Sequence, residues 1–259
     1  MLLRRIKAHI EKENWFAVFV DFFIVVVGIL IAFQITEWSE QRKIDRETIE
    51  FTHKLKSDLA EEAWMYEFAV EYYTDARDNA VRVVDALEGK SEVSDEALVI
   101  AAYRATQYTP IDRRRSTYDE LTATGRISLI NDTELLTVAK DIYNFRSYEY
   151  IEERGTGSQY REAFRKHIPS AVQRAVQIAC GDRFIEYMNY DAIIDPLSYR
   201  CSPDVAAEEI KGAAEVLREN ETILPLLRLR LAELETTTRL LTVTFQDIHE
   251  GLKQYRDTE

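Results

Sequence analysis

One apolar run constrains this chain more than any other feature: WFAVFVDFFIVVVGILIAFQITEW, from Trp15 to Trp38. At ~1.5 Å per residue, a helix between the two indoles is about 35 Å long. The hydrocarbon core of a bilayer is about 30 Å thick, so both rings would lie near its interfaces. A core helix of a soluble protein shows a polar face, and residues 22–33 have none. The run therefore predicts a single transmembrane helix over residues 15–38.

A cleaved signal peptide is the alternative, because Arg4, Arg5 and Lys7 precede the run as a charged leader would. A signal peptide ends in small residues at its cleavage site. Bulky side chains follow Leu30 instead, and the run is too long for a signal peptide. We therefore expect the anchor to remain attached.

The basic residues around the span favour one orientation by a small margin. The leading tail, residues 1–14, has four basic and two acidic residues, while Arg42, Lys43 and Arg46 follow the span. Long domains after a span translocate largely regardless of their charge. We therefore expect residues 1–14 in the cytoplasm and residues 39–259 as an extracytoplasmic domain, in the periplasm if the membrane is a bacterial inner membrane.

The two cysteines, Cys180 and Cys201, enclose twenty residues. In an oxidising compartment a disulfide between them would contribute about 3 kcal/mol by closing this loop. Two buried free thiols are the alternative, because reduced cysteine packs as a small apolar residue. No second cysteine pair or histidine pair lies at ligand spacing around them, so we expect no metal site there.

Few residues in this chain break helices. Only 8 glycines and 5 prolines occur among 259 residues, and neither type lies between Ile29 and Glu88. No segment alternates apolar and polar residues as a half-buried strand does. One apolar stripe recurs every three or four positions, at Ile44, Phe51, Leu55, Leu59, Tyr66, Val70, Tyr73, Ala80, Val84 and Leu87. The sequence predicts an all-α protein whose transmembrane helix continues into the first long helix of an antiparallel bundle.

Local signals divide the rest of the chain into shorter helices. The expected helix starts are Ser94, Thr117 with Glu120 as a capping box, Asn131 with Glu134, the residue after Pro169, and Ser202 with Pro203. The expected helix ends are Gly89, Tyr108, Gly125, Lys166 and Gly181, with a bend or break at Gly155 and Gly157.

The C-terminal segment has the most regular pattern, a seam with alternating spacings of four and three residues. It consists of Leu227, Leu231, Leu234, Thr238, Leu241, Phe245, Ile248, Leu252 and Tyr255. Such a seam packs inside a bundle or forms a coiled coil with a second copy, and we favour packing inside the bundle.

Two segments of the chain carry a resemblance to a known family. VVVGILIAFQITEWSEQRK (Val25 to Lys43) and STYDELTATGRISLINDTELL (Ser116 to Leu136) are similar to two blocks of a family of bacterial membrane proteins known only as a domain of unknown function. The resemblance covers about forty residues. It implies one N-terminal span and a helical extracytoplasmic region in the bacterial inner membrane, and it carries over no activity. Asp21 departs from the family, which more often has Glu at the start of the apolar run.

No catalytic motif is found, and we expect no enzyme, no catalytic residue and no cofactor. Glu50 and His53 form one Glu-x-x-His, half of the motif that holds two metal ions in helical bundles. The other histidines lack an acid three positions earlier, so this pair is interpreted as a solvated helix face. The glycine-containing Gly155–Ser158 lacks the lysine of a phosphate-binding loop.

Charge disfavours nucleic acid as a partner, because the chain carries −13 and shows no broad basic stripe after the span. Arg113, Arg114 and Arg115 are the one basic cluster. The simpler interpretation is a loop that pairs with nearby acids such as Asp119 and Glu120, and the alternative is contact with an anion or a lipid headgroup.

The span itself contains the candidate contacts for a membrane partner. An ionisable residue in a membrane usually faces protein or water, so Asp21 is one candidate, although it lies near the headgroups. Gly28 and Ala32 would allow close approach of another helix, and Gln34 could form a hydrogen bond.

These observations favour a membrane-anchored interaction or accessory protein of unknown specific role. Its expected partners are the bilayer and another membrane protein, or a second copy through the transmembrane or C-terminal helix. The alternative is an extracytoplasmic ligand-sensing bundle that signals through a partner membrane protein, because residues 1–14 are too short to form an output domain.

Overall fold

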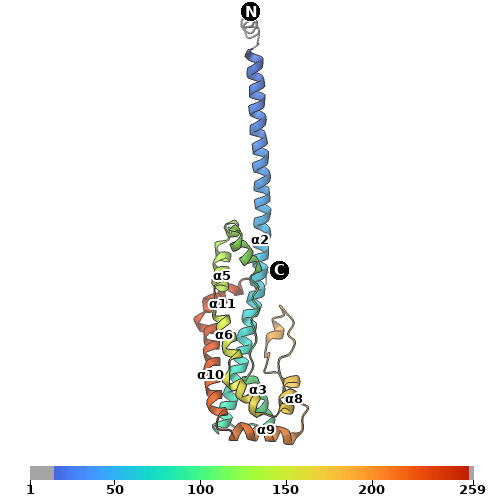
Figure 1. Ribbon diagram of the computed structural model, residues 1–259, viewed down its shortest axis with the longest axis vertical. Coiled ribbons are helices and arrows are strands. Elements are labelled where there is room, and N and C mark those ends of the chain that lie inside the picture. Colours follow the sequence, from blue (N-terminus) through green and yellow to red (C-terminus); the bar gives the residue numbers. More distant parts are fainter. Residues whose placement is uncertain (1–14, 257–259) are drawn as a thin grey trace, which may run out of the picture. The chain divides into compact units, whose positions relative to one another are not determined.

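The computed structural model describes residues 15–256, except for the side chains of residues 15–18, Asp21 and Ser147. The chain divides into two units, residues 1–53 with 128–130 and residues 54–127 with 131–259, which are described separately. The described residues form helices and no strand (Figure 1), which confirms the predicted all-α fold class.

The helices have the following bounds, with η1 and η2 as 3₁₀ turns and η3 as a π-helical segment. They are α2 (Trp15–Leu87), α3 (Asp95–Ala105), α4 (Ser116–Ala123), η1 (Arg126–Leu129), α5 (Thr133–Tyr143), α6 (Ser147–Thr156), α7 (Gln159–His167), α8 (Ser170–Cys180), η2 (Asp191–Ile193), α9 (Ala207–Glu219), α10 (Ile223–Arg239), η3 (Leu240–Thr244) and α11 (Gln246–Lys253).

The first unit contains the apolar part of α2. Among the described residues, one helix is long and apolar enough to cross a membrane, and none of its most apolar window is buried. Large apolar side chains there stand free of the rest of the chain, such as Phe22 at 65% exposed and Phe33 at 63%. Burying such side chains in an apolar surrounding is strongly favourable, so this segment is suited to a bilayer.

In the second unit, residues 54–87 of α2 form the centre of the bundle. Leu55, Leu59, Tyr66 and Tyr73 of the predicted stripe are buried. Side chains outside the stripe are buried as well, including Trp64, Tyr72 and Ala76. The helix is buried on more than one face because segments far apart in the sequence contact it, as Figure 1 shows for α6 and α10 beside its cyan part.

Several of the predicted helix ends are confirmed. The hydroxyl of Ser94 accepts a hydrogen bond from the N–H of Ala97 at 3.2 Å and caps α3. Gly89 and Gly125 have φ of +73° and +70°, and residues other than glycine are strained in this conformation. α8 begins directly after Pro169 and ends before Gly181.

Other predicted boundaries are confirmed in part or are wrong. The expected break at Gly155 and Gly157 is confirmed, because α6 ends at Thr156 and Gly157 is its C-cap. A second break near Asn144 was not predicted, so the helix expected from Asn131 to Lys166 is three helices, α5, α6 and α7. Its N-cap is Asp132 rather than Asn131. Ser202 and Pro203 do not start a helix, because α9 begins at Ala207 and the Ser202 hydroxyl donates to Glu96 instead, at 2.9 Å.

The C-terminal seam packs inside the chain. Leu227, Leu234, Leu241 and Leu252 are fully buried, and α10 contacts α7 and α9 while α11 contacts α5. The π-helical segment η3 separates α10 from α11, and the hydroxyl of Tyr66 donates to the carbonyl of Leu241 within it at 2.8 Å. The seam is therefore used for packing within one chain.

Candidate functional site

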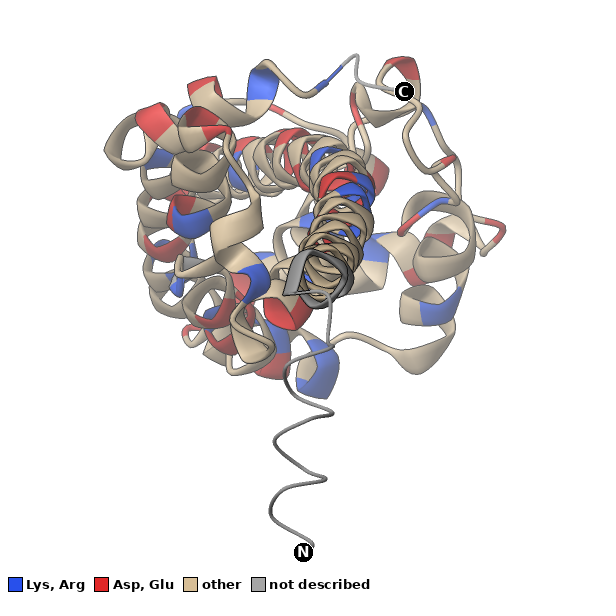
Figure 2. Cartoon of the chain, turned by 90° about the horizontal axis from the view of Figure 1, so that it is seen from above, with Lys and Arg blue, Asp and Glu red and all other residues tan. Residues whose placement is uncertain are grey.

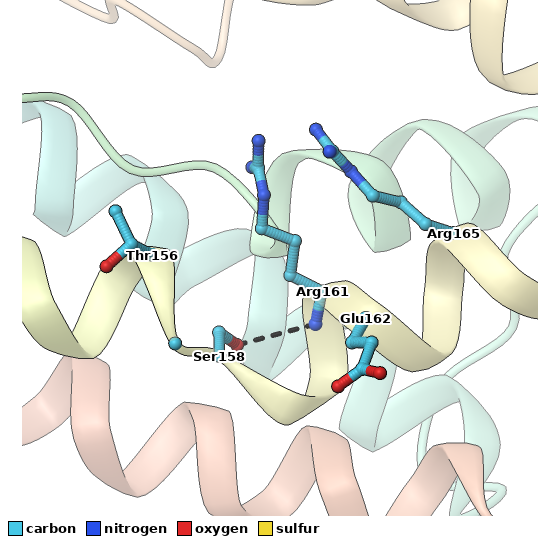
Figure 3. Close-up of a pocket in the computed structure, with 6 residues that line it drawn as sticks. Thr156, Ser158, Arg161, Glu162 and Arg165 are labelled. Atoms are coloured by element: carbon cyan, nitrogen blue, oxygen red, sulfur yellow. Dashed lines mark hydrogen bonds between the residues drawn. The ribbon is translucent and has the colours of Figure 1, made fainter.

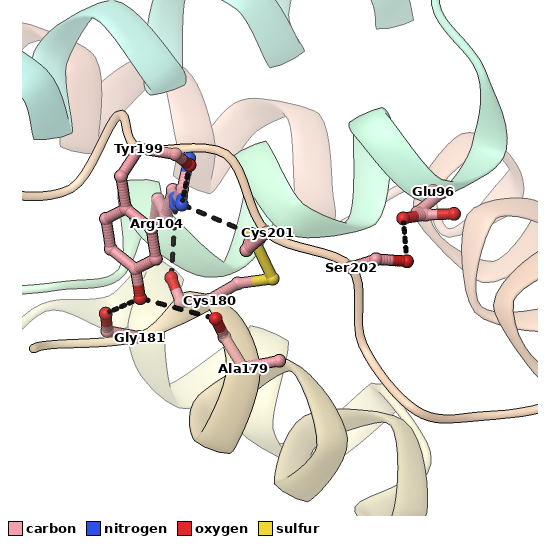
Figure 4. The surroundings of a disulfide bond; sticks show 8 residues. All are labelled: Glu96, Arg104, Ala179, Cys180, Gly181, Tyr199, Cys201 and Ser202. Carbon is pink, nitrogen blue, oxygen red and sulfur yellow. Dashed lines mark hydrogen bonds between the residues drawn. A yellow bond between two sulfur atoms is a disulfide. The ribbon is translucent and has the colours of Figure 1, made fainter.

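A disulfide joins Cys180, the last residue of α8, to Cys201, and their Cα atoms are 5.4 Å apart (Figure 4). The buried guanidinium of Arg104 on α3 lies beside the bond. It donates to the carbonyls of Cys180 and Tyr199 at 3.1 and 2.8 Å. Burial lowers the pKa of Arg104, and the two carbonyls replace part of the hydration that the cation loses. The disulfide and Arg104 together close the loop after α8.

A second buried charge holds the same loop against α2. One carboxylate oxygen of Asp75 accepts hydrogen bonds from the backbone N–H groups of Leu197 and Ser198, at 2.8 and 2.9 Å. A carboxylate with backbone donors is among the stronger kinds of hydrogen bond. Neither Asp75 nor Arg104 was singled out in the sequence, yet these two residues position the loop.

Arg113 lies in a polar cluster in the bundle core, which consists of Glu62, Arg113, Tyr148, Tyr66 and His249. Only 11% of its side chain is exposed. Its guanidinium donates to the carbonyl of Phe145 at 2.9 Å and to that of Ile142, two carbonyls at the end of α5. Two of its terminal nitrogens thus cap the end of α5 from another segment, and the predicted anion contact of Arg113 stays a prediction.

Glu62 on α2 is the acid of this cluster and is fully buried. Its Oε1 atom accepts the backbone N–H of Arg114 at 2.5 Å, and its Oε2 atom lies 3.9 Å from Nε of Arg113. Within the described part of the chain, no hydrogen bond reaches Oε2. Burial raises the pKa of Glu62, while the nearby Arg113 opposes this change. The site thus holds a carboxyl that takes up a proton more readily than an ordinary glutamate.

Three aromatic rings complete the cluster. The Tyr148 ring lies 5.1 Å from the Arg113 guanidinium, and its buried hydroxyl has no hydrogen-bond partner among the described residues. Burial raises the pKa of Tyr148 far above its ordinary value, so it stays protonated. His249 stacks on Tyr66 with ring centres 5.0 Å apart, and burial lowers its pKa. Burial thus disfavours the charged forms of Glu62, Tyr148 and His249 alike.

The other two arginines of the basic cluster form ion pairs near the surface. Arg114 lies 3.0 Å from Glu61, and its Nε atom donates to the hydroxyl of Tyr187. Arg115 makes a bidentate contact with Asp119, with its closest N···O distance at 2.8 Å. The pairing of Arg115 with Asp119 agrees with the simpler interpretation of the cluster as a loop paired with nearby acids.

The N-terminus of α4 is capped from α2 rather than from its own sequence. A carboxylate oxygen of Asp58 accepts the backbone N–H of Thr117 at 3.1 Å. The predicted capping box of Thr117 and Glu120 is therefore wrong, because the N-cap residue of α4 is Arg115 and its side chain makes no cap bond. Asp58 and Glu62 are one helical turn apart and hold the two ends of the Arg114–Thr117 segment.

The candidate contacts of the span lie on α2 in the first unit. Gly28, Ala32 and Gln34 are exposed, and an added side-chain carbon at Gly28 would meet nothing within 4 Å. The side chain of Asp21 lies outside the described part of the structure. Gly28 lies seven positions after Asp21, and Ala32 lies four positions after Gly28. These spacings place the three residues on one helix face, whereas Gln34 lies on another.

Glu50 and His53 are both exposed. Among the described residues, no group of three or more histidine, cysteine or acidic side chains is arranged to hold a metal ion.

Figure 2 shows basic and acidic residues intermixed around the helices of the bundle. A hollow of about 470 Å³ lies between α5 and the segment from η3 to α11, lined by residues such as Lys140, Asp141 and Asp247, and it contains no predicted site residue.

The chain was compared with known proteins in three ways. Residues 21–164, more than half of the chain, match the model of a family described as "Family of unknown function (DUF6090)". This range includes both segments that carry the resemblance in the sequence. No curated protein matches the chain, and no solved structure matches it. The chain belongs to the DUF6090 family of unknown function.

Proposed function

We propose that this protein is a single-pass, membrane-anchored helical accessory protein that binds another membrane protein through its span. The observation that carries the proposal is the apolar window of α2, in which no residue is buried. A bundle with its own closed core does not need such a segment for folding. A bilayer and a partner helix would each provide the apolar contacts that this segment lacks within the chain.

The proposed location is the bacterial inner membrane, with residues 1–14 in the cytoplasm, residues 15–38 in the bilayer and residues 39–259 in the periplasm. The basic leading tail supports this orientation. The bond between Cys180 and Cys201 gives independent support, because disulfides persist in the periplasm and are rare in the cytoplasm.

The proposal includes no catalytic step. The buried ionisable groups of the bundle, such as Asp75, Arg104 and Arg113, bind backbone groups that connect one segment of the chain to another. Groups used in this way stabilise a fold. A rigid bundle of this kind suits a protein that presents a surface or holds a partner in place.

The proposed partner is one transmembrane helix of another membrane protein, which approaches the face of α2 that contains Asp21, Gly28 and Ala32. A small residue lets two backbones approach closely. A carboxyl at that depth usually has a polar partner, so a complementary residue on the other helix is expected.

Co-purification in a mild detergent tests this proposal. Wild-type protein should retain a membrane protein in fixed ratio, and the variants Asp21→Leu and Gly28→Leu should lose most of it. Val26→Leu, on the opposite face of the helix, is the matched control and should retain the partner. Equal recovery from all four proteins would contradict the proposal. A second copy of this chain as the sole cross-linked partner would replace it with self-association.

A further inference from the structure

Two arginines on α7, Arg161 and Arg165, lie one helical turn apart. Figure 3 shows their side chains extending to the same side of the helix, while Glu162 points to the other side. Glu162 forms its ion pair with Lys166, at 2.5 Å. The two guanidinium groups therefore extend to one side, and the carboxylate of Glu162, which also lines the hollow there, is paired with Lys166 instead of with either arginine.

No carboxylate of the described chain lies within 4.0 Å of either guanidinium group. Arg161 is half-buried, donates to the carbonyl of Thr106 at 2.9 Å and lies 4.7 Å from the ring of Tyr108. The guanidinium of Arg165 has no hydrogen-bond partner among the described residues. Arg165 is exposed. Several other arginines of this acidic chain bind an acid, such as Arg114, Arg115 and Arg228.

The electrostatics of the pair are unfavourable without a ligand. Burial, and then the charge of Arg165, lower the pKa of Arg161. A guanidinium stays protonated in a protein, so the repulsion between the two cations is not relieved by losing a proton. A bound anion would relieve it.

The structure provides space for such an anion beside both arginines. One hollow of about 290 Å³ is lined by Thr156, Gly157, Ser158, Arg161, Glu162 and Arg165. A second, of about 380 Å³, is lined by Tyr103, Thr106, Phe164, Arg165, Gln173 and Gln177. Arg165 lines both hollows. Hydrogen-bond donors are frequent in their linings, and the volumes suit a small polar molecule.

We propose that Arg161 and Arg165 form a binding site for a small molecule that carries an oxyanion group, either a carboxylate or a phosphate. Two guanidinium groups can give an oxyanion several charge-assisted hydrogen bonds, which are stronger than bonds between neutral groups. This inference goes beyond the proposed function and does not depend on a membrane partner. Such a site is what the alternative function, an extracytoplasmic ligand-sensing bundle, requires.

Thermal unfolding of the full-length protein in detergent tests the site. Inorganic phosphate and succinate are the two probes, compared with sodium chloride at equal ionic strength. At saturation, the correct probe should raise the Tm of the wild type by about 4 °C. The probe that acts identifies the oxyanion as phosphate or carboxylate.

Three variants make the test specific. Arg161→Gln and Arg165→Gln should abolish the probe-dependent shift in Tm. Arg165→Gln is the decisive one, because its guanidinium has no partner within the described chain and its loss should not disturb folding. Arg239→Gln is the control, since Arg239 is exposed on α10 and lines neither hollow. It should keep the full shift.

Either of two results would overturn the site. One is a wild type that neither probe stabilises beyond sodium chloride. The other is an equal shift in wild type, Arg165→Gln and Arg239→Gln, which would show a general salt effect. Both results would leave co-purification through the span unaffected, so failure of this inference is distinguishable from failure of the proposed function.

Discussion

The two parts of α2 differ in what surrounds their side chains. In residues 22–38, apolar side chains are exposed and none is buried. In residues 54–87, the same helix buries apolar residues together with polar ones, including Glu62, Asp75 and Asn79. Each of these three makes a hydrogen bond within the chain.

This difference shows which surroundings each part requires. The bundle part carries its own partners, so buried acids are tolerated because backbone donors compensate them. The apolar part has no partners in the described chain, and it needs an apolar environment outside the chain. One helix thus combines a segment stabilised from within the chain with a segment that is long and apolar enough to cross a membrane.

The largest expected effect comes from placing charges in the apolar part. The double variant Ile29→Arg, Leu30→Arg should cost about 5–7 kcal/mol for insertion, because one arginine at the middle of a span costs about 2.5–3.5 kcal/mol. Membrane fractionation should then find the protein outside the membrane pellet. Ile49→Arg is the control, since Ile49 is 71% exposed beyond Trp38, and it should stay in the pellet. Retention of the double variant in the membrane pellet would show that the apolar part of α2 does not depend on apolar surroundings outside the chain.

The second prediction compares the same substitution, leucine to alanine, in the bundle part and in the apolar part of α2. Leu59→Ala should lower the free energy of unfolding of the bundle by about 2–5 kcal/mol, because Leu59 is fully buried and its loss leaves a cavity. Leu30→Ala should change it by less than about 0.5 kcal/mol, since Leu30 is 57% exposed. Chemical unfolding in detergent, followed by circular dichroism, measures both. Equal effects would show that the bundle depends on the apolar part.

The smallest expected effect concerns pH and tests the buried acid of the bundle part. Burial raises the pKa of Glu62, so the folded protein binds this proton more tightly than the unfolded chain. Stability therefore falls as pH rises through the raised pKa and returns on acidification. Each tenfold difference in proton affinity between the two states corresponds to about 1.4 kcal/mol.

Glu62→Gln removes this dependence, so its free energy of unfolding should increase relative to wild type as the pH rises above the ordinary pKa of a glutamate. Glu61→Gln retains Glu62 and should follow the wild-type profile. Denaturation curves at several pH values measure the difference. Parallel profiles for wild type and Glu62→Gln would show that the carboxyl does not change its protonation on folding.

The sequence predicts those features of the fold that depend on residues close together along the chain. Gly89 and Gly125 end helices because their conformations have positive φ, and Ser94 caps α3 with its own hydroxyl. The start of α4 could not be predicted from local signals, because Asp58 is 59 positions from Thr117. The break between α5 and α6 has no glycine or proline to mark it, and Arg113 stabilises it from another segment.

The polar cluster had one signal in the sequence that would have revealed it. Glu62 continues the spacing of Leu55, Leu59 and Tyr66, which places an acid within an apolar stripe. Such an acid is expected to be buried and to have a partner. The partner itself, Arg113, could not be identified, because the apposition of α2 and the segment before α4 depends on tertiary packing.

The central claim is that the apolar part of α2 crosses the inner membrane and places the bundle in the periplasm. An alkaline phosphatase fused after Glu259 tests it most directly, because this reporter is active only outside the cytoplasm. We expect an active enzyme in intact cells, and little activity when the span is disrupted by Ile29→Arg, Leu30→Arg. An inactive phosphatase together with a fluorescent cytoplasmic reporter at the same position would contradict it.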